Sequence, residues 1–166
     1  NTTDRNQLDQ CAQLLKKQKP VLQQYVMDEI FAIMQNEEAW IAPYYAGDYL
    51  TMWEENEDLC FYLPEEEGFN LFVDAMCIPT CCENKDAAER FINFLCEPEI
   101  AGGNMDWVCY STPISEAKQF LDPEVAESEV SYPAEEKLIK ASSYAFLNPE
   151  TTRLVEALFM EVRNQH

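Results

Sequence analysis

An almost uncharged apolar segment, residues 70–78, sets the strongest limit on how this chain can fold. Its one charged residue is Asp74, and every other side chain in it except Asn70 is apolar. A strand that is apolar on both faces is typical of a sheet covered by helices on both sides. We therefore predict a central strand over residues 70–78 that is buried on both faces.

The segment that follows predicts the strongest helix of the chain, residues 84–95. Asn84 is a preferred N-cap residue, because its side-chain oxygen can accept a hydrogen bond from a backbone N–H of the first turn. Phe91, Phe94 and Leu95 then recur at a spacing that places them on one helix face. A buried strand followed by an amphipathic helix is the repeating unit of α/β folds.

The same alternation extends along the rest of the chain. Apolar runs bounded by turn residues predict short strands at 40–45 and 59–63. Caps and apolar periodicity predict helices at 4–19, 28–35, 98–107 and 149–162. A further helix is predicted after a turn at 46–48 and ends near 56, and three shorter helical pieces are predicted at 115–121, 123–127 and 133–140. Strands alternating with helices predict an α/β architecture.

Charge excludes some classes of partner. Asp and Glu number 31 against 11 Lys and Arg, so the net charge is −20. Nucleic acids and anionic membrane surfaces are disfavoured as partners, because they are bound through clustered basic side chains. A cationic ligand suits an acidic surface, although acidity that serves only solubility is the simpler interpretation. No apolar run reaches the roughly 18–20 residues needed to span a bilayer.

The seven cysteines predict neither a metal site nor a full set of disulfides. Their number is odd, no two have CxxC spacing, and the only histidine is the terminal His166. Cys60, Cys77, Cys96 and Cys109 lie in apolar surroundings, so we predict that they are small buried hydrophobic residues. We expect no cofactor and no metal.

Enzymatic motifs are weak. A single terminal histidine leaves Ser-His-Asp and Cys-His arrangements without a base, and the chain has no GxSxG, P-loop or GxGxxG sequence. Carboxylates are abundant, so a hydrolase with two catalytic acids stays open as an alternative. A plain interaction domain is a third possibility.

Asp74 and several aromatic residues are the candidates for a binding site. An unpaired carboxylate costs several kcal/mol to bury, so Asp74 should face a cleft, cap a loop or pair with a lysine. Aromatic faces attract ammonium groups within about 6 Å, although core packing is the simpler role for each ring. The aromatic residues near predicted element ends are Tyr44, Tyr45, Phe72, Trp107, Tyr110 and Tyr144.

Several linked segments resemble the spermidine/putrescine-binding proteins of ABC transporters. They are YYAGD (44–48), GFNLFVDAMCIP (68–79), NKDAAERFINFL (84–95), CEPEIA (96–101) and YSTP (110–113). The resemblance runs along the whole chain and implies the C-terminal half of a two-lobed, type II periplasmic-binding-protein fold. It assigns residues 1–72 and 113–166 to the second lobe and residues 73–112 to the first.

The resemblance also implies a ligand and a site. Asp74 falls at the ammonium-binding aspartate, and Phe72 falls where the family often has a tryptophan wall. Tyr45 and Tyr110 match two further aromatic positions, and Tyr144 matches another that depends on the placement of a gap. The implied protein is an extracytoplasmic polyamine receptor and not an enzyme. It works with a permease and meets the membrane only through an N-terminal anchor outside these residues.

The chain is about half as long as members of that family, so other polyamine contacts are expected to lie outside it. The strand predicted at 73–78 would then lack its neighbours, and we expect exposed apolar surface and self-association. A receptor for another small solute, such as an iron complex or a sulfonate, is the nearest alternative function. Asp74 with aromatic walls argues against an anionic solute.

Overall fold

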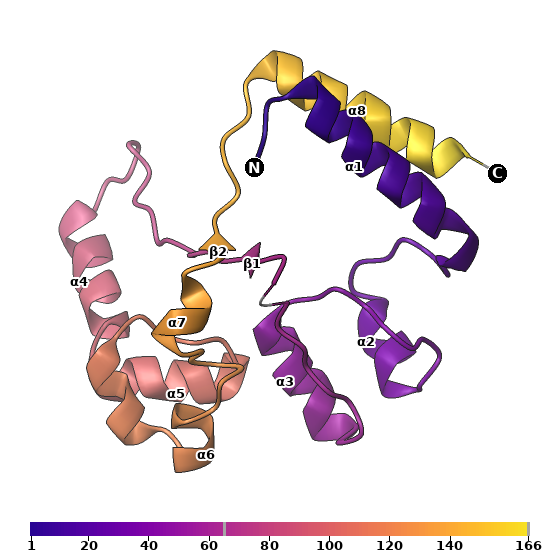
Figure 1. The fold of residues 1–166 in the computed structure, drawn as a ribbon. Coiled ribbons are helices and arrows are strands. Elements are labelled where there is room, and N and C mark those ends of the chain that lie inside the picture. The colour runs from indigo at the N-terminus through magenta and orange to yellow at the C-terminus, as the bar shows by residue number, and fades with distance from the viewer. Residues whose placement is uncertain (65, 166) are drawn as a thin grey trace. The chain divides into compact units, whose positions relative to one another are not determined.

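The structure is a computed structural model that describes residues 1–64 and 66–165. Helices dominate the described residues (Figure 1). In chain order the elements are α1 (Arg5–Gln18), η1 (Lys19–Val21), α2 (Ile30–Gln35), α3 (Ala46–Glu55), β1 (Phe69–Asn70), α4 (Lys85–Leu95), α5 (Pro98–Val108), η2 (Ser115–Phe120), α6 (Pro123–Ala126), α7 (Glu135–Leu138), β2 (Ala141–Ser142) and α8 (Pro149–Asn164).

The chain forms two compact units. Unit 1 comprises the described residues of 1–28, 70–72 and 142–166, and unit 2 comprises those of 29–69 and 73–141. These units differ from the lobe segments implied by the resemblance, which concern a protein about twice this length. The lobe assignment therefore stays a prediction.

Unit 1 is built on two helices from opposite ends of the chain. Helices α1 and α8 lie side by side (Figure 1), and Ala12 and Val162 are buried. Asp4 caps α1 by accepting a hydrogen bond from the Gln7 N–H at 2.9 Å, and Asn148 caps α8 in the same way. The predicted first and last helices are confirmed.

Unit 2 has its core where α5 meets η2. Met105 of α5 and Ala117 of η2 are buried there, and the Tyr132 hydroxyl lies 3.1 Å from the Met105 sulfur. Gly102 permits this close approach, because a Cβ at that position would lie 3.1 Å from the Phe120 Cβ. Asn84 caps α4 through the Ala87 N–H at 3.1 Å, as predicted.

The prediction of strands at 40–45, 59–63 and 70–78 is wrong. Among the described residues only β1 and β2 are strands, each two residues long, and they pair with one another. Residues 40–45 and 59–63 have no regular structure, and neither have residues 71–79, where a strand buried on both faces was predicted. The central strand also proves exposed, since every residue from 71 to 77 is solvent-exposed. A strand needs a neighbour to satisfy its backbone N–H and C=O groups, and residues 73–78 find none in the described chain.

The start of the second predicted helix also needs correction. Helix α2 begins at Ile30 and not at Asp28, and its N-cap residue, Glu29, makes no capping bond through its side chain. Residues 28–29 form a turn in place of a first helical turn.

The prediction that four cysteines are buried is also wrong. Cys60, Cys77 and Cys96 are exposed, and Cys109 is half-buried. The apolar residues that flank them in the sequence are half-buried or exposed and none is fully buried, so an apolar neighbourhood does not translate into burial. All seven cysteines are free thiols. Within the part of the chain that the structure describes, no three His, Cys, Asp or Glu side chains cluster as metal ligands. None of its helices combines the length and apolar character that crossing a membrane requires.

Candidate ligand-binding site

Tyr110 is locked onto the start of helix α3. Its ring lies directly on Gly47, where an added Cβ would come within 2.4 Å of the Tyr110 Cδ2 atom. The Tyr110 hydroxyl donates a hydrogen bond to the Asp48 carboxylate and accepts one from the Asp48 backbone N–H. The loop after α5 is thereby tied to the first turn of α3. We call Gly47, Asp48 and Tyr110 the tyrosine lock.

The tyrosine lock changes the acidity of its phenol. Burial of the ring raises the pKa of Tyr110 above its ordinary value, and so does the neighbouring Asp48 carboxylate, which accepts a hydrogen bond from the phenol and carries negative charge. The Asp48 N–H opposes this shift, because it stabilises a phenolate. The hydroxyl therefore stays protonated at neutral pH, and it is already engaged by Asp48.

We expect the chain to lose stability as the pH rises above about 10, the ordinary tyrosine pKa. In that range the folded chain keeps the Tyr110 proton while the unfolded chain loses it, so the free energy of unfolding falls with pH. Below pH 10 the contribution is fully present. Urea unfolding between pH 8 and 11 measures the slope, and Tyr110→Phe, which keeps the ring on Gly47, should make it shallower. An unchanged slope in that variant would contradict the role given to the lock.

Tyr45 stands beside the lock as an exposed aromatic face. It is the N-cap residue of α3, in extended backbone conformation, and its side chain is 43% exposed. Tyr44 supports it, with the two ring centroids 5.3 Å apart, and Tyr44 in turn packs edge-on against Phe31 of α2 at 6.0 Å. The structure thus brings two of the predicted site residues, Tyr45 and Tyr110, to the same end of α3.

Phe72 and Asp74 lie elsewhere, on the extended segment that follows β1. Phe72 belongs to unit 1 and is 40% exposed, whereas Asp74 belongs to unit 2 and is exposed. Asp74 makes no ion pair or hydrogen bond with any residue that the structure describes. The alternatives in which Asp74 pairs with a lysine or caps a loop are therefore not realised among the described residues. Its carboxylate is open to a ligand.

Tyr144 is the most exposed of the predicted aromatic residues, at 82%. It lies in the extended stretch after β2, and the hydroxyl of its neighbour Ser143 donates a hydrogen bond to the Leu71 carbonyl at 2.8 Å. Within unit 1, this hydrogen bond joins the residue that precedes Phe72 to the residue that precedes Tyr144.

Sequence reasoning missed the part played by Asp48. Its only signal was its place after Gly47 in the YYAGD segment, which looked like an ordinary turn into a helix. Its partner, Tyr110, lies far along the chain. Within unit 2, carboxylates and aromatic faces are both present, which is chemistry suited to binding a cation and not to activating a nucleophile.

An open carboxylate and exposed aromatic faces are groups suited to binding a cation. Residues 1–141 match the sequence model of the bacterial extracellular solute-binding protein family. The chain belongs to this family.

Relatives of the chain include a polyamine-binding protein and a polyamine sensor. The chain is 28% identical over 140 residues to a spermidine/putrescine-binding periplasmic protein of Salmonella typhimurium, a match covering 84% of this chain and 40% of that protein. It is 26% identical over 163 residues to a norspermidine sensor of Vibrio cholerae, covering 96% and 45%. The first of these names describes a binding protein.

Solved structures confirm the predicted fold class. The spermidine/putrescine ABC transporter substrate-binding protein of Streptococcus pneumoniae has a TM-score of 0.89 and 33% identity, with 98% of this chain and 50% of that chain covered. A putative spermidine/putrescine transporter protein of Listeria monocytogenes gives 0.86 and 32%, with 99% and 50% covered. The chain therefore has part of the type II periplasmic-binding-protein fold. It spans about half the length of the relatives it matches.

Proposed function

We propose that this chain supplies part of the polyamine site of an extracytoplasmic solute-binding protein that serves an ABC importer and its permease. The observation that carries the proposal is the Asp74 carboxylate, which is exposed, has no partner among the described residues and lies two positions after Phe72. The relatives named above, which bind spermidine, putrescine or norspermidine, support the choice of ligand.

The chemistry of a polyamine suits these residues. Spermidine and putrescine carry ammonium groups separated by apolar methylene chains, so they need carboxylates for the charges and flat apolar walls for the stems. Asp74 supplies a carboxylate, and Phe72, Tyr45 and Tyr144 supply exposed aromatic faces. Tyr110 contributes a ring face only, since Asp48 occupies its hydroxyl. The net charge of −20 raises the local concentration of any cation and by itself selects none.

Calorimetric titration tests the proposal. Spermidine and putrescine are titrated into this chain and into the same chain joined to the remaining part of the Streptococcus pneumoniae relative. Magnesium is the control, because it matches the charge of putrescine but has no methylene stem. We expect one saturable site for the polyamines at about 0.15 M salt, where surface attraction is largely screened, and no such site for magnesium.

The possible outcomes differ clearly. Saturation of the joined form alone would show that the site needs residues outside this chain. Equal and unsaturable heats for magnesium and putrescine in both forms would reject a polyamine site and leave only bulk electrostatic attraction.

A further inference from the structure

The ring of Tyr144 depends on its backbone for its position. Tyr144 is 82% exposed, and its side chain makes no hydrogen bond or ring contact with any residue that the structure describes. The residues around it, 143–148, have no regular structure. Whatever holds residues 143–145 in place therefore also sets the direction of the aromatic face that Tyr144 presents.

The side chain of Asn1 bonds the backbone on both sides of Tyr144. Its Nδ2 donates a hydrogen bond to the Ser143 carbonyl, and its Oδ1 accepts one from the Ala145 N–H, the latter at 2.9 Å. All of these residues belong to unit 1, and Figure 1 shows the N-terminal end of the chain beside the stretch between β2 and α8. One planar group thus serves the two peptide groups that flank Tyr144, as the backbone of a neighbouring strand would.

A carboxamide matches the two groups that it meets here. Its nitrogen donates and its oxygen accepts from one rigid plane, which suits one C=O and one N–H. An aspartate of the same size has only acceptor oxygens when it is ionised, so it could not serve the Ser143 carbonyl. Alanine serves neither group. Replacing Asn1 by alanine therefore removes both bonds and frees the backbone around Tyr144.

Asn1 is itself connected to the first turn of α1. The hydroxyl of the next residue, Thr2, accepts a hydrogen bond from the Asp4 N–H at 3.1 Å and donates one to the Gln7 side chain. Asp4 in turn caps α1 through the Gln7 N–H. The carboxamide therefore ties the backbone around Tyr144 to a helix whose start is fixed by its own cap.

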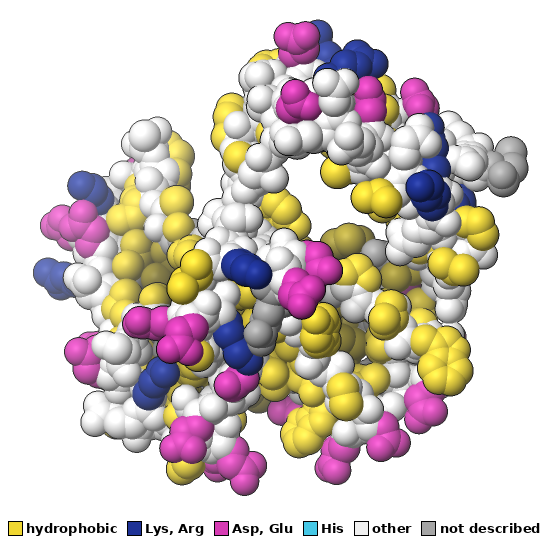
Figure 2. Space-filling view, in the orientation of Figure 1, with side chains coloured by type: hydrophobic (Ala, Val, Ile, Leu, Met, Phe, Trp, Pro, Cys, Tyr) yellow, Lys and Arg dark blue, Asp and Glu magenta, His cyan; other side chains and the backbone are white. Residues whose placement is uncertain are grey.

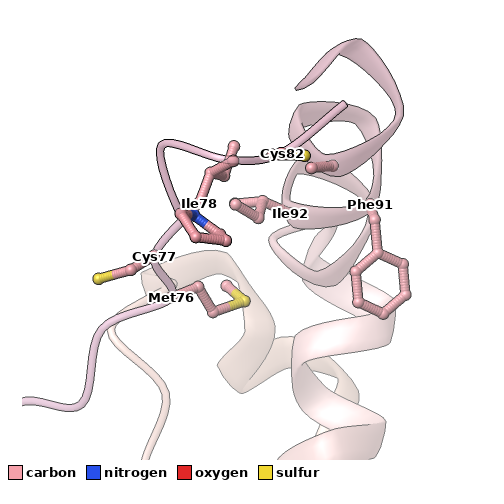
Figure 3. Close-up of a pocket in the computed structure, with 8 residues that line it drawn as sticks. Met76, Cys77, Ile78, Cys82, Phe91 and Ile92 are labelled. Atoms are coloured by element: carbon pink, nitrogen blue, oxygen red, sulfur yellow. The ribbon is translucent and has the colours of Figure 1, made fainter. Parts of the chain in front are cut away.

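Fixed aromatic faces matter because neither charge nor a cavity marks the place of a cation on the described residues. Acidic side chains are spread over the visible face of each unit (Figure 2), so attraction alone leaves a cation without a defined position. The hollow beside α4 is lined by apolar residues and cysteines, such as Met76, Ile78 and Cys82 (Figure 3), and none of its described lining residues is acidic. Under the proposed function, a polyamine takes its position from Asp74 and from rings that are held in place.

We propose that Asn1 is a positioning residue of the polyamine site. Its carboxamide fixes the peptide groups on both sides of Tyr144 and so holds that ring as a wall for the methylene stem of the ligand. This inference rests on the proposed function for its ligand, whereas the contact between Asn1 and residues 143–145 exists without one. The effect of Asn1 on binding passes through Tyr144, and that dependence can be measured.

Amide exchange followed by NMR without polyamine tests the contact itself. Asn1→Ala should speed exchange of the Ala145 N–H by about fivefold or more, because that amide loses its acceptor. The Thr151 N–H, which Asn148 caps, is the internal reference and should not change, because it reports opening of α8. Asn6→Ala is the matched control, since Asn6 is an exposed asparagine of α1 whose side chain makes no hydrogen bond with a described residue. An unchanged Ala145 rate in Asn1→Ala would overturn the inference.

The affinity for spermidine tests the role in binding, in the form of the chain that binds polyamine. Asn1→Ala should weaken binding by about fivefold, the effect of losing hydrogen bonds of ordinary strength, and Asn6→Ala should not. The same change made in a Tyr144→Ala background should have no further effect, because the ring that Asn1 positions is gone. A merely structural role would instead weaken binding equally in both backgrounds, and that result would overturn the inference.

Failure of the proposed function would look different. If no form of the chain binds spermidine, although Asn1→Ala still speeds exchange of the Ala145 N–H, the ligand is wrong and the fixed backbone around Tyr144 stands. If spermidine binds and Asn1→Ala changes only the exchange rate, the polyamine site exists and Asn1 does not position it.

Discussion

Asp74→Asn should weaken the binding of spermidine and putrescine by about 30-fold or more. Loss of one partner of a close, hydrogen-bonded charge pair costs about 2 kcal/mol or more, which corresponds to that factor. Asparagine keeps the size of the side chain and can still accept a hydrogen bond, so the loss reports the negative charge. Because Asp74 is exposed and makes no hydrogen bond or ion pair with described residues, the fold should be unaffected.

Calorimetry on whichever form of the chain binds polyamine measures this effect. Asp58→Asn is the matched control, because Asp58 is also an exposed aspartate of unit 2 and its replacement changes the net charge equally. If both variants lose affinity to the same small extent, bulk electrostatics explains the binding and Asp74 has no special role. Circular dichroism should show unchanged unfolding for both.

The helices could be predicted from the sequence because their signals are local. Asp4, Asn84 and Asn148 each accept a hydrogen bond from an N–H three residues further on, which is a capping bond typical of these residue types. Pro149 begins the last helix, as proline prefers at a first turn. Helix α2 began away from the expected cap, at a site where no side chain fixes the boundary.

The strands could not be predicted in the same way, because a strand depends on its neighbours. Residues 70–78 have the composition of a central strand, yet the described chain offers only β2, which pairs with β1 and reaches no further than the Leu71 N–H. The same absence explains the exposed cysteines: Cys77 lies in a segment whose apolar composition indicates burial only when a sheet surrounds it.

The candidate site contains residues that a local sequence pattern predicts and residues that depend on contacts between distant segments. Phe72 and Asp74 could be proposed from a continuous segment, and the structure leaves both exposed, although their part in binding stays a prediction. The tyrosine lock depends on a contact between α3 and the loop after α5, which no local pattern encodes. Asp48 was passed over because an aspartate at the turn into a helix has an ordinary local explanation.

Gly47→Ala should destabilise the chain by about 2–3 kcal/mol, at the upper end of what overpacking costs. The added Cβ would lie 2.4, 2.5 and 2.6 Å from three carbons of the Tyr110 ring. The ring cannot simply swing aside, because its hydroxyl is held by both the carboxylate and the backbone N–H of Asp48. Either the hydrogen bonds or the start of α3 must move, and Tyr45, the N-cap residue, moves with it.

Gly103→Ala is the control, and it should have the opposite sign. Gly103 lies inside α5, where an added Cβ meets nothing within 4 Å, so the change to alanine should stabilise the helix by about 0.5–1 kcal/mol. Urea unfolding followed by circular dichroism compares the two variants under one condition. Two stabilising results would mean that Tyr110 yields easily and that the lock does not hold Tyr45. Opposite signs, with polyamine affinity reduced only in Gly47→Ala, would show that close packing at the start of α3 keeps that aromatic face in place for its ligand.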